Sequence, residues 1–140
     1  MNHLLPLATL LSLFSAVTVA SEYVKTPSAD GASVYIISPQ PGETVPTTFK
    51  VKFGLNGMGV APAGTDRANT GHHHLLINGK TLPDLNMPLG GEVTHFGGGQ
   101  TETELTLSPG KHTLQLILGD QNHVPHDPPV VSDEVTVYVK

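Results

Sequence analysis

The sequence alternates between short apolar segments and stretches rich in glycine and proline, and this pattern restricts the fold more than any other feature. Apolar residues at every second position, bounded by turn-forming residues, are typical of half-buried β-strands. The expected strands are 33–38, 47–55, 72–77, 92–96, 101–107, 112–118 and 135–139. No window repeats with the helical period of about 3.6 residues. The sequence therefore predicts an all-β protein, a single antiparallel immunoglobulin-like β-sandwich.

The alternation also predicts which side chains form the core. In segment 47–55 the residues Phe49, Val51 and Phe53 share one face, while Lys50 and Lys52 share the other. The expected core consists of alternate residues from three strands: Phe49, Val51, Phe53, Leu114, Leu116, Val135, Val137 and Val139. Because the chain contains no cysteine, this core must hold the fold without disulfides.

The N-terminal residues differ in character from the rest of the chain. The run from Leu4 to Val19 is apolar and ends in the small residues Thr18-Val19-Ala20, which is typical of a cleaved signal peptide. We therefore expect residues 1–20 to be a signal peptide and the protein to be periplasmic or secreted, with no membrane span in the mature form. An uncleaved N-terminal anchor is the alternative. Residues 21–32 are expected to form a linker, and residues 33–140 the β-sandwich domain.

The most distinctive motif is the segment 71–79, Gly-His-His-His-Leu-Leu-Ile-Asn-Gly. Its apolar part is expected to be a strand. The dipeptide Asn78-Gly79 is a strong hairpin signal, so a tight turn and a brief return through residues 80–82 are expected.

Strand geometry separates the three adjacent histidines. Residues at positions i and i+2 project to the same face about 7 Å apart. His73 shares its face with Leu75 and Ile77, so that face is expected to point into the core. His72 and His74 would then project together from the opposite face. Two imidazoles at this spacing can reach one metal ion through bonds of about 2.0–2.1 Å.

Further ligands would have to come from other loops. The candidates are His95, His123 and His126, with Asp120 or Asp127 as a carboxylate ligand or as a hydrogen-bond partner of a ligand. Nitrogen and carboxylate ligands without thiolate suit Cu(II) or Zn(II). Protons compete with the metal for imidazole, so binding is expected to weaken below a pH of about 6.

A structural role is the alternative explanation for these histidines. Their ring nitrogens could fix long loops through hydrogen bonds to the backbone. His112 in particular shares a face with Leu114 and lies beside a turn, so it is not expected to be a ligand.

Composition excludes several functions. The formal net charge is -5 with histidines neutral, and no basic stripe is present, so nucleic acid and anionic membranes are unsuitable partners. No catalytic acid or base stands out, which favours binding over catalysis. A copper/zinc dismutase-type enzyme is the weakest interpretation. The sequence thus predicts an exported periplasmic domain with a histidine-rich Cu(II) or Zn(II) site. The alternative is a structural or protein-interaction β-sandwich of the cell envelope, with an envelope protein as its partner.

Three segments of the sequence also resemble a known family. They are Gly71–Ile77, His95–Glu102 and Gly119–Pro129. Together they resemble an exported bacterial family described as domain of unknown function 4399, over the chain from about Phe49 to its end. The resemblance implies a signal peptide and one small domain, and no established reaction. The same segments contain His72, His73, His74, His95, His123 and His126.

Overall fold

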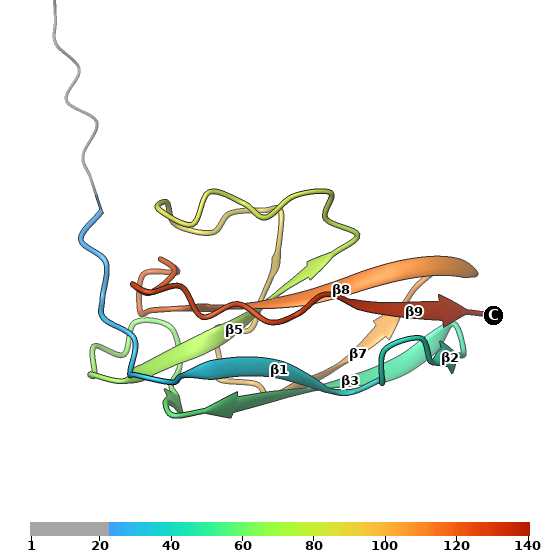
Figure 1. The fold of residues 1–140 in the computed structure, drawn as a ribbon, viewed down its shortest axis with the longest axis horizontal. Coiled ribbons are helices and arrows are strands. Elements are labelled where there is room, and N and C mark those ends of the chain that lie inside the picture. Colours follow the sequence, from blue (N-terminus) through green and yellow to red (C-terminus); the bar gives the residue numbers. More distant parts are fainter. Residues whose placement is uncertain (1–22) are drawn as a thin grey trace, which may run out of the picture.

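Two β-sheets pack face to face in residues 23–140, the part of the chain that the computed structural model describes (Figure 1). The smaller sheet has the order β1-β3-β7, and its strands are Ser33–Ser38, Thr48–Asn56 and Glu102–Thr106. The expected signal peptide, residues 1–20, lies outside the described residues. Within residues 23–140 we find no helical segment with the length and hydropathy of a membrane span.

The larger sheet carries the histidine motif. Its order is β2-β9-β8-β5-β4, and β6 also pairs with β5. These strands are β2 (Thr44–Val45), β4 (Gly59–Val60), β5 (Thr70–Ile77), β6 (Thr94–His95), β8 (Gly110–Gly119) and β9 (Val135–Val139). The all-β sandwich is therefore confirmed. Two of its pairings, β2 with β9 and β4 with β5, are parallel, and an immunoglobulin-like topology stays a prediction.

The main core lies between the two sheets and contains every residue that the alternation predicted. Phe49, Val51 and Phe53 project from β3 toward alternate residues of β8 and β9. Val51, Leu114, Leu116 and Val137 are completely buried. Each such side chain contributes about 1.5–3 kcal/mol through removal of apolar surface from water.

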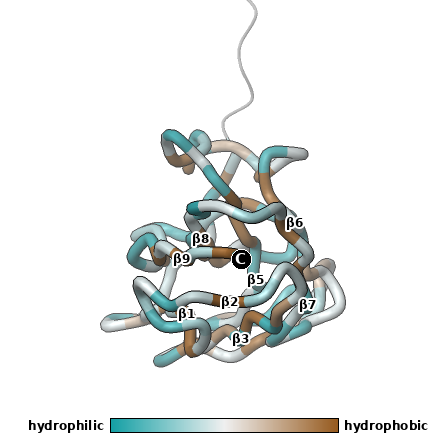
Figure 2. The backbone as a smooth tube through the Cα atoms, turned by 90° about the vertical axis from the view of Figure 1, so that its right-hand side faces the viewer, coloured by the Kyte–Doolittle hydropathy of each residue, from teal (hydrophilic) through white to brown (hydrophobic). Residues whose placement is uncertain are grey.

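A second apolar cluster covers the other face of the larger sheet. Leu76 of β5 and Ile117 of β8 pack there against Leu89 and Val93. The last two belong to the long segment between β5 and β6, which passes over that face (Figures 1 and 2). Leu76 projects from the same face of β5 as His72 and His74, and this segment buries its side chain.

The expected hairpin at Asn78-Gly79 is wrong. Asn78 has the positive φ that the turn signal predicts, 55°, but residues 80–82 form no strand. Instead β5 pairs with the distant strand β8. The Asn78 Oδ1 atom accepts a hydrogen bond from Thr113 N at 2.9 Å, so the end of β5 is fixed to β8.

Part of the expected linker, residues 21–32, contacts the domain. Pro27 forms a parallel bridge with Asp127. Asp127 N donates to Thr26 O, and Ser28 N donates to Asp127 O, both at 3.0 Å. Residues 26–28 therefore lie along the loop that follows β8.

Candidate metal centre

Strand β5 presents its three histidines to two different environments. His72, His73 and His74 are all completely buried, because the main core covers one face of β5 while the second apolar cluster and the loop that carries His123 lie on the other. His73 points into the sandwich, with its ring 5.2 Å from that of Phe53. His72 and His74 share the opposite face, with ring centroids 4.5 Å apart. The alternation of side chains along a strand predicted this division of the three histidines between the two faces.

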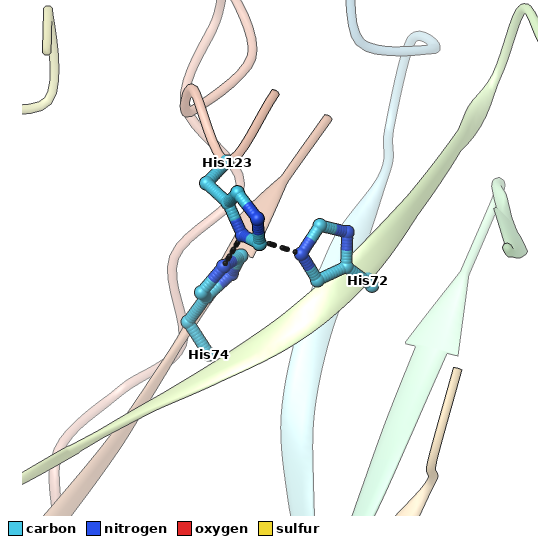
Figure 3. Close-up of side chains that lie close together, drawn as sticks. All are labelled: His72, His74 and His123. Carbon is cyan, nitrogen blue, oxygen red and sulfur yellow. Dashed lines mark hydrogen bonds between the residues drawn. The ribbon is translucent and has the colours of Figure 1, made fainter. Parts of the chain in front are cut away.

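His123 reaches the same face from the loop between β8 and β9. Its Nδ1 atom lies 3.0 Å from His72 Nε2 and 3.1 Å from His74 Nε2 (Figure 3). One nitrogen from each of the three residues lies within 4.8 Å of the others, an arrangement that could hold a metal ion.

His95 adds a fourth imidazole beside His123. It lies opposite His74 in the pairing of β6 with β5. Its Nε2 atom donates a hydrogen bond to Gly90 O at 2.7 Å, since a carbonyl oxygen can only accept. In a neutral ring its Nδ1 atom therefore carries a lone pair, and this atom lies 3.2 Å from His123 Nδ1.

These contacts exceed what hydrogen bonding can satisfy. A neutral imidazole nitrogen carries either one proton or one lone pair, yet three nitrogens surround His123 Nδ1 at 3.0–3.2 Å. The buried Nδ1 atoms of His72 and His74 have no hydrogen-bond partner among the described residues. Unpaired buried nitrogens cost about 1–3 kcal/mol each. The cluster is therefore poorly explained as a hydrogen-bond network.

Asp120 shapes the loop that delivers His123. Its Oδ1 atom accepts from Asn122 N at 2.9 Å and from Val124 N at 3.0 Å. Its Oδ2 atom accepts from the Thr26 hydroxyl at 3.2 Å. His123 itself has a φ of 63°, a backbone conformation that residues other than glycine seldom adopt. Asp120 thus positions His123 by holding the backbone on both sides of it.

Burial favours the neutral form of His72, His74 and His123. The pKa of His72 falls from 6.5 to about 4, mainly through burial and then through the neighbouring His123 and His95, while Asp120 opposes them. Burial, followed by the other three imidazoles, lowers the pKa of His74 to about 3. Burial and then His95 also lower the pKa of His123. Neutral rings are the form that binds metals, so protons compete at a lower pH than the value near 6 expected from unperturbed imidazole.

The structure does not bring His126 into this cluster. Its Nε2 atom donates to Thr70 O at 3.1 Å. A Cβ atom added to Gly71 would lie 2.9 Å from both His126 Cε1 and Leu118 Cγ, so His126 lies on the core face of β5. His72 and His74 project from the other face.

Asp127 and His112 also have other roles. Asp127 is exposed and pairs through its backbone with the N-terminal segment. His112 donates to Ser108 O at 2.7 Å and accepts from Asn78 Nδ2 at 2.8 Å. Both of its nitrogens are thus engaged, which agrees with the structural role expected for it.

Some contributors to the site could not be found from the sequence. The Gly90 carbonyl fixes His95, and the Thr26 hydroxyl supports Asp120 from more than ninety residues away. A carbonyl group has no sequence signal, and Thr26 lies in a segment without periodicity.

The fold and the site together define an all-β sandwich with a buried histidine cluster on the outer face of its larger sheet. The chain belongs to the family described as Domain of unknown function (DUF4399), which matches residues 51–140. That region contains all four clustered histidines. No curated protein and no solved structure matches the chain.

Proposed function

We propose that this protein is an exported metal-binding domain that holds Cu(II) or Zn(II) through His72, His74 and His123, with His95 as a fourth ligand. One observation carries the proposal: three imidazole nitrogens converge on His123 Nδ1 at 3.0–3.2 Å, where at most one hydrogen bond can form. A cation bound between these rings would take one lone pair from each as a ligand.

The three distances to His123 Nδ1 fit such an ion. Nitrogens bound at about 2.0–2.1 Å to one tetrahedral ion are about 3.3–3.4 Å apart, and the spacing shrinks to about 2.8–3.0 Å for neighbours in a square plane. The separations from His123 Nδ1, 3.0, 3.1 and 3.2 Å, fall between these geometries.

The chemistry of the ligands selects the metal. An all-imidazole set suits Cu(II) and Zn(II), and Cu(II) has the higher intrinsic affinity for nitrogen ligands. Asp120 adds a nearby negative charge that acts on His72 and His123 and favours a cation. The absence of cysteine from the chain removes thiolate ligands, which copper(I) and iron–sulfur sites commonly use.

Thermal unfolding with and without metal tests this function. An ion that binds only the folded protein raises the melting temperature, and at 100 times Kd it adds about 2.7 kcal/mol of stability. We expect Cu(II) and Zn(II) to raise the melting temperature, and a chelator to reverse the effect. An unchanged melting temperature with every divalent ion would refute the proposal.

A structural or protein-interaction role is the alternative, and one observation favours it. The cluster lies where two long loops meet, since Leu89 N donates to His123 O at 2.9 Å and His95 donates to Gly90 O. In that case the imidazoles only connect the loops, and metal would not change stability. Export to the periplasm or out of the cell is part of the proposal and rests on residues 1–20 alone.

A further inference from the structure

The four clustered histidines differ in their access to solvent. His72 and His74 are completely buried, His123 is partly buried and His95 is exposed. His123 connects the two ends of this series, because its Nδ1 atom is close to a nitrogen of each other residue. The cluster therefore extends from the interior to the surface.

The surroundings of the buried pair leave the exposed end as the approach for an ion. Behind β5 lies the main core, into which His73 projects. Along the histidine face of the sheet, Leu76 and Ile117 are covered by the second apolar cluster. An ion from solution therefore meets His95 and His123 before it reaches His72 and His74.

The histidines also differ in how firmly the sheet holds the strand that carries each of them. His72 and His74 belong to a strand of eight residues with hydrogen-bonded neighbours on both sides. His95 belongs to β6, which has only two residues. The side chain of His95 is fixed by Gly90 O in the long segment between β5 and β6. His95 can thus be displaced with far less disturbance of the sheet.

A carboxylate stands at the same exposed end. Glu92 is exposed, and its Oε1 atom accepts a hydrogen bond from Gly90 N at 3.0 Å. Gly90 links Glu92 to His95, because the Gly90 carbonyl oxygen accepts the hydrogen bond from His95 Nε2. A negative charge beside the outermost imidazole attracts cations to that position.

We infer that His95 is the labile ligand of the site, the position at which metal is taken up and handed to an acceptor with a stronger chelating group. The inference rests on the proposed metal-binding function. In the exchange the bond between the ion and His95 Nδ1 breaks and a bond to the acceptor forms, while the other three imidazoles still hold the ion. The oxidation state of the metal does not change. The protein is then a carrier whose buried ligands give affinity and whose exposed ligand controls transfer.

Stopped-flow transfer of Cu(II) to excess EDTA tests the inference. The protein with residues 1–20 removed is loaded with one equivalent of Cu(II), and its visible absorption is followed after mixing. In His95→Ala we expect release about tenfold faster than in the wild type, because differences in affinity act mainly through dissociation rates. His74→Ala should lose stoichiometric binding. His112→Ala, which removes an imidazole outside the site, should behave as the wild type.

A second variant guards against a folding defect. His95→Gln keeps an amide that can donate to Gly90 O but removes the ring nitrogen, and it should show the same faster release. Release within twofold of the wild type in both variants would overturn the inference, as would a loss of affinity equal to that of His74→Ala. If the wild-type protein takes up no Cu(II) at all, the proposed function fails instead, so the two failures are distinguishable.

Discussion

Gly119 of β8 lies directly against the imidazole of His74. A Cβ atom added to Gly119 would lie 2.5 Å from His74 Cε1 and 3.0 Å from His74 Nδ1. Gly119 pairs with His72 across the two strands, so its missing side chain would point to the histidine face. The absence of a side chain at this position makes the space that the His74 ring occupies.

Gly119→Ala should therefore displace His74 and weaken the site. Forcing a methyl group into a packed position costs about 1–3 kcal/mol, and we expect a loss of this size in the free energy of unfolding. Urea denaturation measures it, and a Cu(II) titration should show weaker binding. Gly91→Ala is the matched control, because no atom lies within 4 Å of a Cβ atom added there. Equal stability and affinity in both variants would contradict this account of Gly119.

Asp120→Asn should weaken metal binding without removing a ligand. The amide can replace only part of the acceptor set that holds Asn122 N, Val124 N and the Thr26 hydroxyl. Loss of a group that orients a ligand costs about 10–100-fold in metal affinity. Isothermal titration calorimetry with Cu(II) measures the change. Asp133→Asn, an exposed carboxylate on another segment, is the control and should bind as the wild type does.

Thr26→Val provides a milder version of the same experiment. It removes one hydrogen bond to Asp120 Oδ2 and leaves the two backbone contacts of Oδ1 in place. Its affinity should lie between those of the wild type and Asp120→Asn. An effect larger than that of Asp120→Asn would mean that Thr26 acts by another route.

The middle histidine of the motif should be dispensable for metal binding. His73 is completely buried in the core, and neither of its ring nitrogens has a partner among the described residues. His73→Leu removes these unpaired atoms and should raise the unfolding free energy by about 1–2 kcal/mol. Calorimetry should show unchanged metal affinity, because His73 faces away from His72 and His74. A loss of binding in a stable variant would show that the faces of β5 are assigned wrongly.

Stability of the metal-free protein should fall as the pH falls below 6.5. Burial lowers the pKa of His72 and His73 to about 4 and that of His74 to about 3, so below 6.5 the unfolded chain binds more protons than the folded one. The stabilisation is complete above 6.5 and is lost progressively toward the folded-state pKa values. Urea unfolding with a chelator present should show a decrease of about 2 kcal/mol or more between pH 6.5 and 4.5. His73→Leu should have a shallower dependence, and a flat profile in the wild type would contradict the lowered pKa values.

The strands could be predicted because their alternation is local. Segments 33–38 and 135–139 coincide with β1 and β9, and the parity of residues 72–74 separated the core-facing histidine from the other two. The partner of β5 could not be predicted in the same way. The dipeptide Asn78-Gly79 is typical of a hairpin turn. Here Asn78 adopts the positive φ where β5 ends, and its side chain bonds to Thr113 of β8.

The composition of the cluster depended on contacts that are distant in sequence. His123 lies 51 residues after His72, and His126 lies only three residues beyond His123. Nothing in the sequence distinguishes these two loop histidines. The structure separates them because the loop positions His123 at a positive φ above the outer face, while His126 returns to the core face beside Gly71.

Calorimetric titration of the protein with residues 1–20 removed, using Cu(II) and Zn(II), tests the central claim most directly. The wild type is compared with a variant that carries His72→Ala and His74→Ala together, and with His112→Ala as the control. The account predicts one tightly bound ion per chain in the wild type and the control, with Cu(II) tighter than Zn(II), and loss of that binding in the double variant. Tight stoichiometric binding that survives the double substitution would place the site elsewhere. Wild-type binding no tighter than that of the double variant would contradict the metal centre itself.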